Sequence, residues 1–212
     1  MKLSYVQYGC GLSAPSSWVN FDSSPTLRIQ KAFLIGNILK SRLNTTFPPN
    51  VLYGDIIKGL PIADDSCDGV YCSHVLEHLS LNDFRKALTN TYKILKNGGI
   101  FRCIVPDLEY AARTYLQTLD SGDKQANLEF CGRNTLLGVE NRMRGAKGLL
   151  VSYLGNAHHL WMWDAPSITV ELEKAGFNKI RVCKFNDSQD QMFKEVEDGG
   201  RFLHAVAIEC KK

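Results

Sequence analysis

Three groups of residues have types and spacing that suit the binding of a polar ligand. A Gly-Cys-Gly bend at residues 9–11 follows a first β-prone run, Asp22 ends a second run, and Asp55 ends a third. Glycine lets a backbone approach a ligand closely, and a carboxylate accepts hydrogen bonds from paired hydroxyls or from an amine. Each group alone is also typical of an ordinary turn. Their placement after successive strands is what favours a binding site.

The elements that position these groups alternate between strands and helices. Apolar and β-branched runs predict strands at 3–8, 18–21, 51–53, 68–73, 100–105, 180–185 and 202–208. Helical spacing and cap residues predict helices at 25–43, from Ser80 to a stop at 97–99, from 107 to 119, and from Asp164 to Gly176. Ser80 and Asp83 fit a capping box at the start of the second helix.

This order predicts an α/β fold, a doubly wound Rossmann-like sheet with helices on both faces. The last two strands follow each other without a helix, so we expect them to pair antiparallel. Ligands of such sheets lie beyond the carboxyl ends of the strands, where the three groups are expected. We expect one domain over residues 1–212, with an insertion at about 115–160 that covers part of the site.

Composition excludes several classes of protein. The formal net charge is only +3, which does not favour nucleic acid as a partner. No run approaches the length of a membrane span, and no secretory signal is expected. The seven cysteines are scattered without a C-x-x-C pair, which is typical of reduced thiols and predicts a cytoplasmic protein.

The ordered motifs resemble those of class I S-adenosylmethionine-dependent methyltransferases, especially small members associated with glycan or small-molecule modification. The resemblance covers nearly the whole chain except 115–155. It rests on segments 6–11, 18–25, 55–61, 68–78, 95–100, 105–107 and 172–177 and on the final strand pair. It implies a seven-stranded sheet whose last strand inserts antiparallel, and S-adenosylmethionine as cofactor.

The resemblance also implies roles for individual residues. Gly9, Cys10 and Gly11 would border the amino-acid end of the cofactor, and Asp22 would hold its ribose. Asp55 and Ile56 would contact adenine, and Ser73 with His74 would lie along the methionine chain.

One departure from the dinucleotide-binding pattern is informative. Only ten residues separate Gly11 from Asp22, too few for a long helix, and the third glycine of G-x-G-x-x-G is absent. A dinucleotide needs that helix terminus for its pyrophosphate. S-adenosylmethionine has no phosphate, so the short loop argues against a nicotinamide cofactor.

His74-Val-Leu-Glu77-His78 matches the H-x-x-E-H pattern of some zinc peptidases. Zinc would need both histidines on one face of a helix and a third ligand, yet His74 directly follows a predicted strand. We therefore expect no metal here and keep a zinc hydrolase only as a remote alternative. Glu77 and His78 are expected to bond the glycine loop or to cap the next helix.

A second unusual stretch places His158 and His159 just before two tryptophans, Trp161 and Trp163. A neutral imidazole there would remove a proton from a methyl acceptor, so both histidines are candidate catalytic bases. The structural interpretation is that the tryptophans pack against the sheet and the histidines lie at the surface. The two interpretations remain open from sequence alone.

The resulting hypothesis is a methyltransferase acting on a small molecule or a glycan-related acceptor. The insertion also contains a cluster of basic residues, Arg133, Arg142, Arg144 and Lys147. Such a cluster either forms a surface exposed to solvent or would recruit a phosphate-bearing or acidic acceptor. No N/D-P-P-Y/F tetrapeptide follows the fourth strand, which disfavours amino-methylation of bases or glutamine by that route. The alternative is a module of the same fold that binds cofactor or a partner and transfers nothing.

Overall fold

The computed structural model describes residues 4–31, 46–139 and 158–212. Its strands are β1 Tyr5–Tyr8, β2 Val19–Asp22, β3 Val51–Tyr53, β4 Cys67–Ser73, β5 Leu95–Pro106, β6 Asn178–Val182 and β7 Ala205–Lys211. Its α-helices are α1 Pro25–Lys31, α3 Leu81–Ile94, α4 Leu108–Asp120, α5 Ala126–Glu129 and α7 Ala165–Lys174. Short turns of other helix types are η2 Leu76–His78, η3 Phe130–Asn134, η4 Gln191–Glu195 and η5 Gly199–Phe202.

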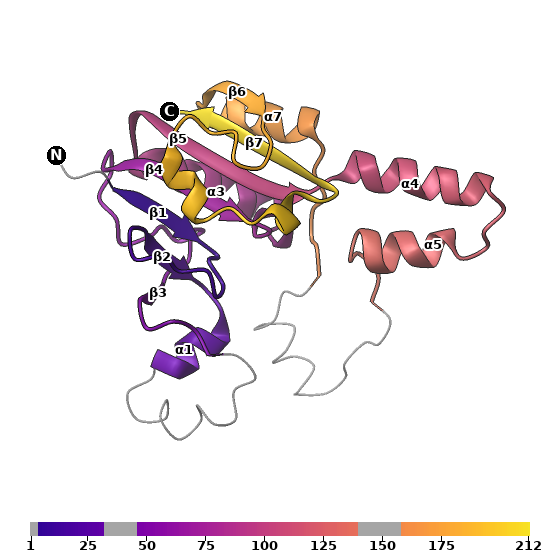
Figure 1. The fold of residues 1–212 in the computed structure, drawn as a ribbon, viewed down its shortest axis with the longest axis horizontal. Helices are drawn as coiled ribbons and strands as arrows, with labels where there is room; N and C mark the ends of the chain where they lie inside the picture. The colour runs from indigo at the N-terminus through magenta and orange to yellow at the C-terminus, as the bar shows by residue number, and fades with distance from the viewer. Residues whose placement is uncertain (1–3, 32–45, 140–157) are drawn as a thin grey trace.

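The seven strands form one sheet in the order β3-β2-β1-β4-β5-β7-β6 (Figure 1). The first five strands in the chain pair in parallel, whereas β7 lies antiparallel between β5 and β6. The predicted fold class is confirmed, including the antiparallel last strand. The strand order reverses beside β1, so the loops after β1 and β4 meet at the edge where ligands of such sheets bind.

Alternation along each strand divides the side chains between two cores. In β4, Val70 and Cys72 enter the main core with helices α3 and α7, whereas Tyr71 enters a second core on the opposite face. Tyr5, Trp18 and Phe193 join Tyr71 there, with the Trp18 and Phe193 rings 5.5 Å apart. Among the described residues this second face is covered by η4 and its neighbours rather than by a long helix, which is consistent with the short loop before β2.

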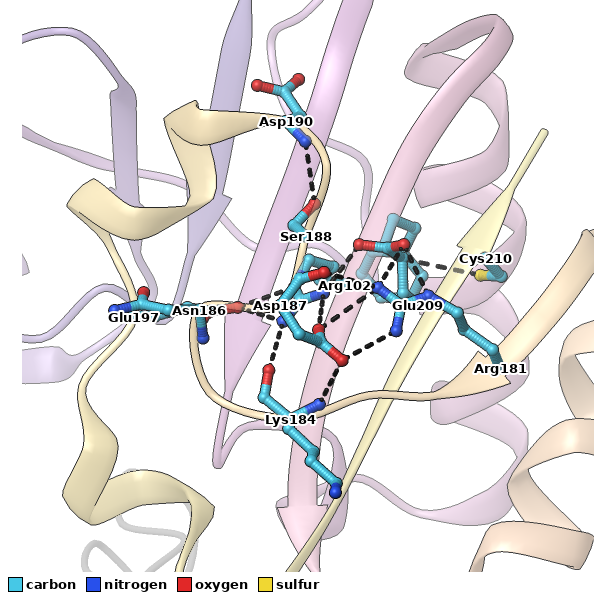
Figure 2. A network of polar contacts seen from close by, with 11 residues as sticks. Arg102, Arg181, Lys184, Asn186, Asp187, Ser188, Asp190, Glu197, Glu209 and Cys210 are labelled. Atoms are coloured by element: carbon cyan, nitrogen blue, oxygen red, sulfur yellow. Dashed lines mark hydrogen bonds and ion pairs between the residues drawn. The ribbon is translucent and has the colours of Figure 1, made fainter.

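A buried ion network ties that covering segment to the sheet (Figure 2). Arg102, in the middle of β5 and 1% exposed, donates to Glu197 at 2.7 Å, to Glu209 at 2.7 Å and to Asp187 at 3.1 Å. It also donates to the Lys184 carbonyl at 3.1 Å. Every partner of this cation therefore comes from β7 or from the segment between β6 and β7.

The caps of the helices agree with the prediction at one helix and differ at another. Asp164 and Ser167 form a reciprocal capping box at the start of α7. Ser80 accepts from the Asp83 amide, but Asp83 does not reach back to the Ser80 amide; its carboxylate accepts from the Ser80 hydroxyl instead. The predicted capping box at Ser80 is therefore only half formed.

Two predicted boundaries are wrong for a common reason. The helix predicted to stop at 97–99 ends at Ile94, and Gly98-Gly99 lies in β5, where Gly98 and Gly99 bond Lys212. The last strand was predicted from Phe202 but starts at Ala205, because η5 and a left-handed His204 (φ 56°) precede it. Both boundaries lie where β5 and β7 begin or end their pairing with each other, and the local sequence does not predict this pairing.

Beyond the sheet, α4 and α5 lie side by side and project away from it (Figure 1). The helix predicted at 25–43 is observed as α1 over Pro25–Lys31, and its predicted remainder lies outside the described residues. No helix in the described ranges has the length and apolar character needed to cross a membrane.

Candidate functional site

The glycine bend after β1 adopts a backbone that favours glycine. Gly9 and Gly11 have φ values of 63° and 55°, and the Cys10 amide donates to the Phe21 carbonyl at 3.1 Å. A Cβ on Gly9 would lie only 2.2 Å from Cγ2 of Val75, in the turn after β4. Burial raises the pKa of the Cys10 thiol to about 12, so this thiol is not a nucleophile near neutral pH.

Asp22 is the last residue of β2, and its carboxylate organises the glycine bend. One oxygen accepts from the Gly11 amide at 3.0 Å and the other from the Ser24 amide at 2.8 Å. The residue is 8% exposed. Each carboxylate oxygen has a second lone pair, so this buried and fixed anion retains capacity to accept from a ligand.

Asp55 lies close by, in the turn after β3 rather than at the strand end predicted for it. Gly54 donates its amide to the Asp22 carbonyl at 3.1 Å, which places the two acids after neighbouring strands. The Asp55 carboxylate accepts from the Ile57 amide at 3.0 Å and lies 3.4 Å from the Lys58 ammonium. Ile56 is buried in the main core, 5% exposed.

At the end of β4, Ser73 and His74 turn toward the same edge of the sheet. His74 has a left-handed backbone, with φ 54°, and its Nε2 lies 3.0 Å from the Arg201 carbonyl. Burial lowers the pKa of His74, but Glu77 and the Arg201 carbonyl raise it, and the net change is a rise. The Ser73 hydroxyl is buried and has no hydrogen-bond partner among the described residues.

A further group of titratable side chains lies next to this edge, and we call Glu77, His78 and His159 the Glu77 cluster. One ligand atom of each residue lies within 4.8 Å of the other two. Glu77 and His78 come from η2, directly after Val75. His159 lies beside them because the two residues that follow it are hydrogen-bonded to Glu77. The amides of Leu160 and Trp161 both donate to the backbone carbonyl of Glu77.

The structural roles expected of the Glu77 side chain are not seen among the described residues. The Glu77 side chain is fully buried, yet neither carboxylate oxygen has a hydrogen-bond partner in the described part of the chain. It bonds neither the glycine bend nor the start of α3, whose cap is Ser80. The Nδ1 atom of His78 lies 3.1 Å from the His158 carbonyl.

The stretch 158–163 divides between surface and interior. His158 is exposed, whereas His159 is 8% exposed, and burial lowers its pKa, which keeps the imidazole neutral near pH 7. Trp163 stacks on Phe84 in the main core at 4.1 Å, and Trp161 is exposed. The two histidines therefore have different environments, which sequence alone did not separate.

The sequence indicated Glu77, His78 and His159 as separate candidates and did not predict that the three side chains lie together. It correctly placed His74 outside the helix, and so found no pair of histidines in i, i+4 register. The third partner is His159, about eighty positions away, and the signal was the adjacent unusual stretch at 158–163. Of the predicted basic cluster, Arg133 is exposed, and its other members lie outside the described residues.

Comparisons with known proteins point to one family. A family model described as a methyltransferase domain matches residues 6–103. A methyltransferase from Archaeoglobus fulgidus, described as SAM dependent, shares 16% identity, with 99% of this chain and 86% of that chain covered at a TM-score of 0.52. A Thermotoga maritima protein described as a SAM-dependent methyltransferase shares 18% identity over 99% of this chain and 82% of that chain, with a TM-score of 0.51. No curated protein sequence matches.

Proposed function

From the fold and from the match to a methyltransferase domain over residues 6–103, we propose that the chain is a class I S-adenosylmethionine-dependent methyltransferase and that it transfers a methyl group to a small molecule or a glycan-related acceptor. The cofactor is S-adenosylmethionine. A net charge of +3 supports an acceptor of this kind over nucleic acid.

One observation carries the assignment of the cofactor site: the buried Asp22 carboxylate, held by the Gly11 and Ser24 amides beside the turn of Asp55. A fixed carboxylate at this position would accept hydrogen bonds from both ribose hydroxyls. Asp55 and Ile56 would border adenine, and Ser73, His74 and the bend at 9–11 would border the methionine part.

Methyl transfer from a sulfonium needs alignment of the acceptor and exclusion of water. We place the acceptor beside the Glu77 cluster, because the cluster adjoins the expected methionine end of the cofactor through Val75 and Gly9. Part of the segment 115–160 would cover it. Of the two candidate bases, His159 is better suited than the exposed His158, since its buried ring is neutral and its Nδ1 has no partner among the described residues.

Calorimetry with S-adenosylmethionine and S-adenosylhomocysteine tests the cofactor site. Asp22→Ala should weaken binding by roughly 100-fold or more, because two hydrogen bonds to a charged acceptor are lost. Asp22→Asn should have a smaller effect, and Asp64→Ala, which removes an exposed acid elsewhere, should have none. No binding by the parent protein at millimolar cofactor, or equal binding by Asp22→Ala, would contradict the assignment.

The alternative is a module that binds the cofactor and transfers nothing. Product formation with any member of a panel of small hydroxylated, amino and glycan-related acceptors would exclude that alternative. Cofactor binding without turnover across the panel would favour it.

A further inference from the structure

We propose that Glu77 is a positioning residue of the cofactor site: it holds the His74 ring as an imidazolium that ties η5 to the end of β4. The proposal rests on the proposed function, because the methionine part of the cofactor is assigned to this edge of the sheet. Glu77 would act on the cofactor only through its neighbour, and cofactor affinity would depend on the protonation of His74.

Both ring nitrogens of His74 face groups that accept protons in hydrogen bonds. Nε2 lies 3.0 Å from the Arg201 carbonyl, in η5, and Nδ1 lies 3.4 Å from Oε1 of Glu77, in η2. A carbonyl and a carboxylate oxygen only accept, so a neutral ring, with its single N–H, suits just one of these contacts. An imidazolium carries a proton on each nitrogen and suits both. The geometry therefore favours the charged ring.

The ion pair is largely shielded from solvent. The Glu77 side chain is fully buried, and that of His74 is 24% exposed. Burial lowers the pKa of His74, but Glu77 and the Arg201 carbonyl raise it, and the net change is a rise. Because water screens a buried pair less than an exposed one, the carboxylate acts strongly on the charge of the ring beside it.

The other charged and titratable side chains near the pair come from η2, η5 and the segment at 158–163. Among the smaller influences on the pKa of His74, the Arg201 guanidinium opposes the charge of the ring. His78 Nε2 lies 3.8 Å from Glu77 Oε1, and the His159 ring lies 5.0 Å from that of His78. Burial lowers the pKa of His159, so its ring is neutral near pH 7. His74 makes the shorter contact with Glu77, and we expect Glu77 to act mainly on this ring.

The backbone of His74 connects this pair to the cofactor site. His74 directly follows β4 and has a left-handed backbone, with φ 54°, which is uncommon for a residue with a Cβ. Such a conformation persists where surrounding contacts hold it. The His74 amide donates to the Ile104 carbonyl at 2.9 Å, and the side chain supplies the contacts to η2 and η5. Loss of the Nδ1 proton would leave a lone pair facing the carboxylate, which would loosen the backbone of Ser73 and His74 beside the cofactor.

The direction of the pH dependence follows from the raised pKa. The ring is charged and the ion pair is intact below the pKa of His74 in the folded protein, and the pair is lost as pH rises through that value. Cofactor affinity should therefore fall as His74 loses its proton. Glu77→Gln should move this fall to lower pH, because a neutral amide no longer stabilises the charge on the ring.

The first measurement uses the full-length protein without cofactor. An NMR titration follows the ring carbon signals of all five histidines, and the signal missing from His74→Gln identifies His74. The pKa of His74 should lie above its ordinary value of 6.5, and Glu77→Gln should lower it. Glu173→Gln is the matched control, because it makes the same substitution at an exposed acid in α7, and it should leave the titration unchanged.

The second measurement is calorimetry with S-adenosylmethionine at a series of pH values. The readout is the difference between the parent and Glu77→Gln, because the amine of the cofactor titrates identically with both. At pH values between the two measured pKa values of His74, the parent should bind roughly threefold or more tightly than the variant. Below both values the rings are charged in both proteins, and the difference should disappear. Glu173→Gln should follow the parent throughout.

Three outcomes would overturn the proposal. These are a His74 pKa in the parent at or below the ordinary value, a response to Glu77→Gln that is confined to His78, or a difference in affinity that is the same at every pH. The parent titration alone decides the first point if a variant fails to fold. If the cofactor does not bind while His74 titrates as expected, the cofactor assignment fails and the positioning role fails with it, but the ion pair stands.

Discussion

Two buried charged clusters in the described part of the protein differ in how closely their charges are paired. Around Arg102, one guanidinium meets three carboxylates and a backbone carbonyl, which come from β7 and from the segment between β6 and β7 (Figure 2). Around Glu77, one fully buried carboxylate is 3.4 Å from the His74 ring and 3.8 Å from the His78 ring, and both contacts are longer than the ion pairs of Arg102.

The difference separates a structural role from a binding role. A buried polar network whose groups are paired with one another holds segments of the fold together, whereas a buried carboxylate that lacks a hydrogen bond from the described residues is a candidate for contact with a ligand. The first cluster joins β5 to β7 and to the segment between β6 and β7, which lie about eighty or more residues further along the chain. The second lies beside the turn where the cofactor is expected.

The largest effect is expected for Arg102→Ala. It would remove the cation that pairs with the fully buried Glu197 side chain, and one of the two arginines that pair with Glu209 and Asp187. Breaking a buried pair in this manner costs about 3–5 kcal/mol in the free energy of unfolding. Urea denaturation would measure it, and a loss below 1 kcal/mol would show that the network does not hold the fold together.

Acid should weaken the same network. Burial raises the pKa of Asp187, but Arg181, the Lys184 amide and Arg102 lower it, and the net value is about 2. Because this is below the ordinary value near 3.9, the stabilisation is complete above pH 4 and is lost as pH falls toward 2. Allowing for partial exposure, the effect is on the order of 1 kcal/mol. Asp187→Asn should flatten the dependence of unfolding free energy on pH in this range; an unchanged slope would contradict the pairing.

A smaller effect is expected at the edge of the network. Arg181 pairs with Asp187 and Glu209, but its side chain is 40% exposed, so solvent screens these contacts. Arg181→Ala should reduce the unfolding free energy by only a few tenths of a kcal/mol. A loss comparable with that of Arg102→Ala would mean that exposure does not distinguish the two arginines.

Glu77→Gln should have the smallest effect on stability, or the opposite sign. The substitution removes a buried negative charge whose contacts with His74 and His78 are long, 3.4 and 3.8 Å, so the unfolding free energy should stay within about 1 kcal/mol of the parent or exceed it. Thermal unfolding measures this. A loss of several kcal/mol would show that Glu77 is paired structurally, and the contrast between the clusters would fail.

The sequence predicted the parts of the fold that depend on local pattern. Alternating strands and helices gave the class of sheet, and residues after the strands placed Asp22 and Asp55 near each other. In the sequence, Arg102 is a single charged residue within an apolar strand. No sequence pattern near it indicates that its partners are carboxylates from β7 and from the segment before β7. The Glu77 cluster was missed for the same reason: His159 reaches it through tertiary contacts that no spacing rule encodes.

The lack of clearance between Gly9 and Val75 has a consequence for evolution and engineering. Even one methyl group at position 9 would overlap the Val75 side chain, and Val75 directly precedes η2, which carries Glu77 and His78. The glycine bend that is proposed to border the cofactor and the turn that carries Glu77 and His78 are therefore packed against each other at Gly9 and Val75. A larger side chain at position 9 would need a smaller one at position 75. We therefore expect a change in acceptor preference to arise through paired substitutions at these two positions.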